Sequence, residues 1–131
     1  MREILFKAKR KDNGEWVEGS LVQTTAVSVK SFIVESACYT FDKWDWLNLV
    51  EVDTETLCQY TETTDAHCNK IWENDIVKYD DEYGYVEWQA WQSAFAVVFN
   101  GWRMNLSEFN DFDLEVYGNA FDNPELLEVE E

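Results

Sequence analysis

Asn100-Gly101 constrains the fold more than any other feature, because it separates two apolar runs that match each other across a hairpin. Asn-Gly favours a two-residue turn, since both residues tolerate positive φ. Such a turn predicts three cross-strand pairs on one face: Phe99 with Trp102, Val97 with Met104, and Phe95 with Leu106. A slip of one residue would destroy this match, so the pattern predicts both an antiparallel hairpin and its register.

A second pair, Asn13-Gly14, predicts an N-terminal ribbon over residues 4–22. A two-residue turn there sets Lys9 opposite Glu18, Ala8 opposite Gly19 and Phe6 opposite Leu21. The charged pair and the apolar pair fall on different faces, as a ribbon with one solvated side requires.

Alternating runs between turn residues predict further short strands near residues 27–35, 48–52, 75–79, 85–92 and 114–117. Residues 53–56 and 80–84 are expected to form loops, and Gly118-Asn119 to turn the last strand. Asn123-Pro124 predicts one short helical turn over residues 125–128. We therefore predict an all-β fold, a small antiparallel barrel or sandwich preceded by an N-terminal β-ribbon. Residues 1–131 are expected to form one domain, with residues 1–55 and 56–131 as candidate sub-halves.

The chain has a net charge of −17, and the charge is unevenly distributed. Residues 1–30 carry six Lys or Arg against four acids, a balance of +2, and residues 31–131 carry four against twenty-three, a balance of −19. Such an acidic body repels phosphate backbones, which argues against direct nucleic-acid binding. Two explanations of this charge distribution are open. The negative charge keeps an aromatic-rich protein in solution, or the mildly basic ribbon docks on an acidic neighbour.

Neither a membrane-spanning run nor an export signal is recognisable, and the three cysteines make no CxxC pair. We therefore expect a cytoplasmic protein without membrane contact.

Candidate catalytic and metal-ligating residues are few. His67 beside Cys68 is the one start of a metal site, but the other cysteines lie at unrelated spacings, so we expect no metal and no cofactor. Glu73 and Asp75 are the only paired carboxylates within a recognisable motif. Short Asp side chains commonly bond turn amides, which favours a structural role for Asp75 over acid–base catalysis.

Tryptophans are the better candidates for a binding surface. Val86, Trp88 and Ala90 share the inward parity of one predicted strand, so we expect Trp88 in the core. Trp91 is out of phase, which indicates either a bulge or exposure. Trp44 and Trp46 lie among charged residues and are also expected at the surface. We predict Trp44, Trp46 and Trp91 as partner-binding residues and assign no catalytic residue.

Three segments resemble the YopX-like family of phage and prophage proteins: residues 1–19, the block over residues 59–77, and residues 118–127. Glycines usual in that family are replaced by Ala8, Cys58, Glu62 and Asn74. Asn tolerates left-handed backbone nearly as well as Gly, so we expect the turn at Asn74 to survive. The resemblance implies a β-rich, oligomeric protein inside a bacterial cell, and the family has no established activity to carry over.

Three hypotheses follow for function. The first is a phage or prophage accessory protein that acts through protein–protein contacts as a homo-oligomer, with a host or phage protein as a further partner. The second is an acidic decoy that imitates DNA and occupies a host DNA-binding protein. The third is a carboxylate-dependent enzyme with Glu73 and Asp75 as its best candidates.

Overall fold

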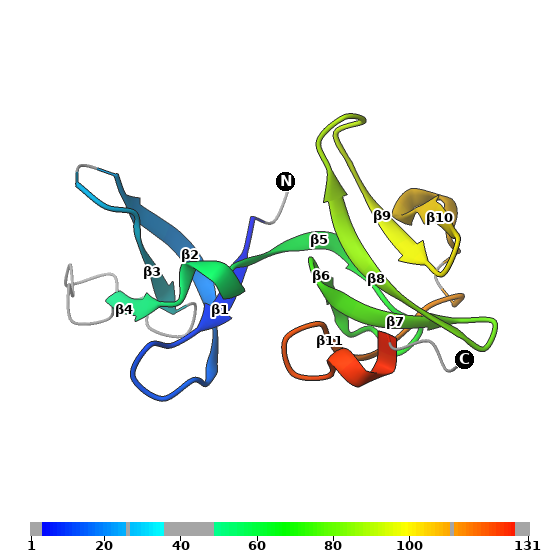
Figure 1. The fold of residues 1–131 in the computed structure, drawn as a ribbon, viewed down its shortest axis with the longest axis horizontal. Helices are drawn as coiled ribbons and strands as arrows, with labels where there is room; N and C mark the ends of the chain where they lie inside the picture. Colours follow the sequence, from blue (N-terminus) through cyan, green and yellow to red (C-terminus); the bar gives the residue numbers. More distant parts are fainter. Residues whose placement is uncertain (1–3, 26, 36–48, 111, 128–131) are drawn as a thin grey trace. The chain divides into compact units, whose positions relative to one another are not determined.

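The computed structural model describes residues 4–25, 27–35, 49–110 and 112–127 of the chain, which divides into two compact units, Met1–Gln59 and Tyr60–Glu131. All strand pairing is antiparallel, and the described helical structure consists of single 3₁₀ turns (Figure 1). The all-β prediction is therefore confirmed. Neither sheet closes into a barrel within the described residues: one has the order β4-β3-β2-β1-β5-β6 and the other β10-β9-β8-β7-β11.

The first unit contains β1 (Phe6–Lys9), β2 (Trp16–Thr24), β3 (Lys30–Glu35), β4 (Leu49–Val52) and the 3₁₀ turn η3 (Thr54–Thr56). Its core consists of Ala8, Val17, Ile33 and Val52, one residue from each strand. The Asp53 side chain accepts a hydrogen bond from the Glu55 amide at 3.1 Å, so the expected turn over residues 53–56 is confirmed. β5 (Cys58–Thr64) begins in this unit, where it pairs with β1.

The ribbon formed by β1 and β2 exists, but its predicted register is wrong by two residues. Lys7 lies opposite Glu18 and Lys9 opposite Trp16. The loop spans residues 11–14, and the Gly14 amide donates to the Arg10 carbonyl at 2.9 Å. Among the residues of this loop only Gly14 has a positive φ, +75°, whereas a two-residue type I′ turn needs a positive φ at both of its residues. A shift by two preserves the faces of the side chains, so the opposite-charge pair survives with Lys7 in place of Lys9.

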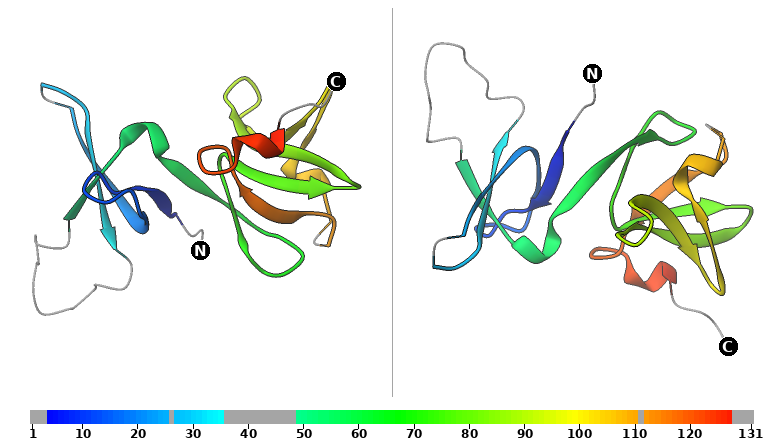
Figure 2. Two further views of the ribbon diagram at one scale, coloured as in Figure 1. Left: turned by 60° about the horizontal axis from the view of Figure 1, so that its bottom comes forward. Right: turned by 90° about the horizontal axis from the view of Figure 1, so that it is seen from above.

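The second unit contains the end of β5, then β6 (Lys70–Trp72), β7 (Asp75–Tyr79), β8 (Glu82–Gln89), β9 (Ala94–Phe99), β10 (Trp102–Asn105), η4 (Leu106–Glu108), β11 (Glu115–Asn119) and η5 (Pro124–Leu127). Its core has seven buried residues: Ile71, Val77, Val86, Val97, Phe99, Leu106 and Leu114. η5 packs against β8, and Figure 2 shows this red turn beside the five-stranded sheet.

The Asn100-Gly101 hairpin has the predicted register. Phe99 pairs with Trp102 and Val97 with Met104, and the Phe99 and Trp102 rings stack at 4.2 Å between centroids. The third predicted pair is absent, because β10 ends at Asn105 and Leu106 begins η4. Leu106 is nevertheless buried in the core with Val97 and Phe99.

One predicted loop is shorter than expected, and one predicted turn is part of a strand. The loop expected over residues 80–84 is a two-residue turn, Asp80-Asp81, with φ of 49° and 67°, and Gly84 lies inside β8. Gly118-Asn119 also continues β11, where a bulge lies between Val116 and Gly118. At both glycines the neighbouring atoms are too close to leave room for a Cβ atom. The close approach of these neighbours, and not the geometry of a turn, therefore explains why glycine occurs at these positions.

Gly84→Ala should destabilise the protein by about 1–3 kcal/mol, because overpacking a tight core forces strain on its neighbours. The added Cβ would lie 2.8 Å from the Val98 carbonyl oxygen and 2.9 Å from Phe99 Cδ1. Urea unfolding monitored by tryptophan fluorescence measures the change. An unchanged midpoint and slope would show that β8 and β9 do not approach this closely.

Candidate functional site

The exposed aromatic side chains of the second unit provide its best candidate for a binding site. Trp91 lies in the turn between β8 and β9 with 70% of its surface exposed, as one of the two sequence alternatives predicted. The Arg103 guanidinium lies 4.6 Å from its ring centroid, a cation–π contact that orients the indole. Trp91 and Arg103 therefore form an ordered surface feature.

Trp88 is not a core residue, contrary to the prediction from strand parity. It is 45% exposed, and its ring meets Phe95 edge to face at 5.0 Å. Gln89 is buried instead, and Ala90 is exposed. Trp88 remains on the same face as Val86, opposite Phe95, but the core does not cover this end of the strand. Trp44 and Trp46 lie outside the described residues.

The sequence around this surface is free of acids. Residues 88–107 contain no Asp or Glu and a single cation, Arg103. They form all of β9 and β10, the end of β8 and the turns between them. In a chain with 27 acidic residues, this segment has a distinct chemistry: aromatic, amide-bearing and weakly cationic. We call Trp91 and Arg103, two exposed residues of this segment that contact each other, the acid-free surface.

The proposed catalytic carboxylates have structural contacts. Asp75 is 2% exposed and accepts a hydrogen bond from the Trp72 amide at 2.8 Å. It thereby fixes the turn in which Asn74 has a φ of 70°, as the sequence predicted for both residues. This contact gives Asp75 a role in the fold.

His67 and Cys68 are exposed, and His67 Nε2 lies 3.1 Å from Glu115 Oε1. No group of three or more His, Cys, Asp or Glu side chains suited to a metal occurs among the residues described.

No helix in the same part of the chain has the length and apolar character needed to cross a membrane.

Asp65 is a buried carboxylate that sequence reasoning missed. It is 4% exposed and accepts hydrogen bonds from the amides of His67, Asn69 and Val116 at 2.8–3.0 Å. It thus joins the loop between β5 and β6 to β11. Burial acts to raise the pKa of Asp65, but the bonds from Val116, Asn69 and His67 outweigh it and hold the pKa below its usual value. The turn pattern Asp-x-His-x-Asn was the one available signal.

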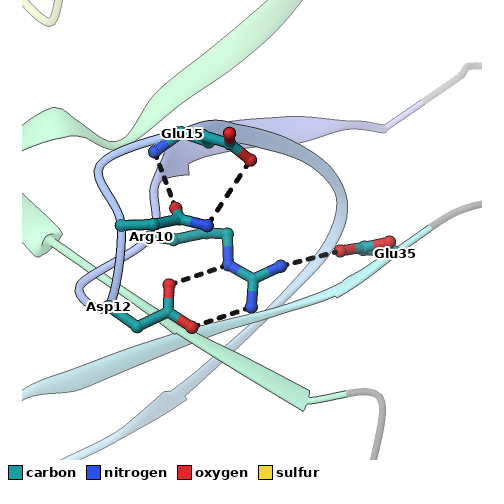
Figure 3. Close-up of polar contacts among 5 residues, drawn as sticks. Arg10, Asp12, Glu15 and Glu35 are labelled. Carbon is teal, nitrogen blue, oxygen red and sulfur yellow. Dashed lines mark hydrogen bonds and ion pairs between the residues drawn. The ribbon is translucent and has the colours of Figure 1, made fainter.

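The cations of the N-terminal ribbon have contacts within their own unit. The Arg10 guanidinium bonds both carboxylate oxygens of Asp12, at 2.9 and 2.8 Å, and lies 3.7 Å from Glu35 (Figure 3). These hydrogen bonds lower the pKa of Asp12. Lys11 lies 3.2 Å from Glu51, and Lys7 and Lys9 approach the Trp16 ring. Arg10 and Lys11 are thus matched by carboxylates of the same unit.

A family model described as YopX protein matches residues 5–128. The chain belongs to the YopX family. A search of curated proteins finds no match. Two of the four positions at which the YopX family resemblance implied glycine have left-handed backbone here, Glu62 at φ 69° and Asn74 at φ 70°. The other two, Ala8 and Cys58, are buried, where little volume is available. Each of the four positions therefore preserves a feature for which glycine is suited: a left-handed backbone at Glu62 and Asn74, or a buried site with little room at Ala8 and Cys58.

Asp65→Asn should destabilise the protein by about 2 kcal/mol at pH 7, because an amide has one acceptor oxygen where the carboxylate serves three amides. Because its pKa is lowered in the folded state, the Asp65 carboxylate stabilises the fold fully at pH values above its pKa in the unfolded chain, about 3.9. This contribution is lost as the pH falls through the lower pKa of the folded state. The difference in unfolding free energy between wild type and variant should therefore shrink between pH 5 and pH 2. Urea denaturation across this range measures it.

Asp80→Asn is the matched control, since Asp80 is exposed and Asn tolerates its positive φ. An equal loss in both variants at pH 7 would mean that net charge, and not the hydrogen bonds to Asp65, is responsible.

Proposed function

We propose that this protein is a phage or prophage accessory protein that works in the bacterial cytoplasm by binding proteins, second copies of itself included. The observation that supports this is the acid-free surface, where Trp91 is 70% exposed and held by Arg103. Aromatic residues and Arg are enriched in protein interfaces, and acids are depleted from interface cores. The catalytic alternative lacks comparable support, because Asp75 bonds a turn amide.

Charge restricts how two copies can meet. With a net charge of −17 each, copies repel wherever carboxylates face carboxylates. A two-fold contact places the same patch of both copies together, so it is least opposed where the patch lacks acids. Residues 88–107 contribute no carboxylate to such a contact, so the acid-free surface is suited to self-association. A host or phage protein is the further partner that we propose for it.

Two modes of self-association predict opposite effects of salt. Contact through the acid-free surface is opposed by repulsion between the acidic bodies, so it should strengthen as salt screens that repulsion from about 0.05 M to about 0.5 M. Docking of the basic ribbon on an acidic neighbour should instead weaken over the same range. Sedimentation velocity at several protein concentrations distinguishes them.

Trp91→Ala should reduce the self-association constant at least about tenfold, the effect of losing a central interface aromatic. It should change the unfolding free energy by no more than about 1 kcal/mol, because the side chain is mostly exposed and its cation–π contact is weak. Phe112→Ala is the control: Phe112 is 83% exposed but lies outside residues 88–107. A wild-type protein that stays monomeric at every salt concentration, and from which no host protein co-purifies, would contradict the proposed function.

A further inference from the structure

The two Asn-Gly pairs of this chain, Asn13-Gly14 and Asn100-Gly101, lie in exposed turns that hold them differently. Asparagine is chemically labile, because its side-chain amide can be lost by attack of the next backbone nitrogen. A following glycine leaves that nitrogen least hindered, since glycine has no Cβ. The same reactive dipeptide thus occurs twice in one protein, in two structural environments.

Deamidation of such a pair begins when base removes the proton from the glycine amide. The amide nitrogen then attacks Cγ of the asparagine side chain, so that a C–N bond forms and the side-chain nitrogen leaves as ammonia. Water opens the resulting succinimide ring at either carbonyl and gives aspartate or isoaspartate. The net reaction consumes one water and releases one ammonia, and it needs both a free glycine N–H and a side chain that can turn toward it.

Hydrogen bonds restrain both reacting groups of the Asn13-Gly14 pair. The Gly14 amide donates to the Arg10 carbonyl at 2.9 Å, which shields its proton from base. Asn13 Oδ1 accepts a hydrogen bond from the Glu15 amide at 2.9 Å, and Asn13 Nδ2 lies 3.4 Å from Glu15 Oε2. These bonds must break before Asn13 Cγ can reach the Gly14 nitrogen, so the fold slows the reaction here.

The Asn100-Gly101 pair has no comparable restraint. Both residues are exposed in the turn between β9 and β10. Within the described part of the chain, neither the Asn100 side chain nor the Gly101 amide makes a hydrogen bond. The pairing of Phe99 with Trp102 closes the hairpin and leaves the two turn residues open to solvent. Both requirements of the reaction are therefore met at this turn.

We propose that Asn100 is a modification site of this protein, at which spontaneous deamidation proceeds by cyclisation onto the Gly101 nitrogen. The product introduces a carboxylate into residues 88–107, which contain no Asp or Glu in the unmodified chain. Isoaspartate also lengthens the backbone of the turn by one methylene group. This site goes beyond the proposed function and does not depend on it.

Incubation of the folded full chain in mildly alkaline buffer tests the proposal. Trypsin then releases the two sites in separate peptides, residues 12–30 and 79–103, each with a single asparagine. Mass spectrometry follows the exchange of amide for acid in each peptide. We expect Asn100 to react at least about fivefold faster than Asn13, because a hydrogen bond that must break first slows a reaction by about this factor.

The urea-unfolded chain is the control, since both pairs lose their folded environment there and the two rates should converge. Asn100→Gln is the matched variant: its side chain is longer by one methylene, so it would have to close a larger ring. This variant should stop the mass change in residues 79–103 and leave the rate at Asn13 as in wild type. Equal rates in the folded chain, the same ratio in urea, or a continued mass change in the variant would overturn the proposal.

Discussion

The large number of carboxylates is the constraint on which the rest of this structure depends, because each loses its hydration when it is buried and repels the others at the surface. With 27 acids in 131 residues, an acidic side chain enters the interior only where it can accept hydrogen bonds from backbone amides. Asp65 and Asp75, the two buried carboxylates among the described residues, both meet that condition. Each fixes a connection between strands of the second unit. The same repulsion limits where another molecule can approach, which gives the acid-free surface its significance.

The two Asn-Gly pairs show how far sequence patterns predict this fold. Asn100-Gly101 has the predicted register because the apolar residues on both sides share one core with Val86 and Leu106. Asn13-Gly14 does not, because Arg10 bonds Glu15 across a four-residue loop, in which the Asn13 side chain accepts a hydrogen bond from the Glu15 amide. Local turn propensity is therefore decisive only where core packing agrees with it.

The candidate sites were less predictable than the strands. Exposure of Trp91 is one of the two alternatives that strand parity leaves open. Its contact with Arg103 depends on the pairing of β9 with β10 and on a long side chain. The sequence did not predict the hollow of about 440 Å³ that is lined by residues of β8 and β9 and by Leu126 and Leu127. It requires η5, which follows β8 by more than thirty residues in the sequence, to return to the face of β8 and β9. The sequence pattern places Gly84 in a turn, because the close approach of the Val98 carbonyl, which requires a glycine there, is a tertiary contact.

The geometry of the second unit leads to one proposed account of this member of the YopX family: it acts by binding proteins through the acid-free surface. The most direct measurement is photo-crosslinking in producing cells from a benzoylphenylalanine placed at Trp91, compared with one at exposed Glu55. The account predicts discrete protein adducts from position 91 and none from position 55. Adducts from position 55 alone, or from neither position, would contradict it.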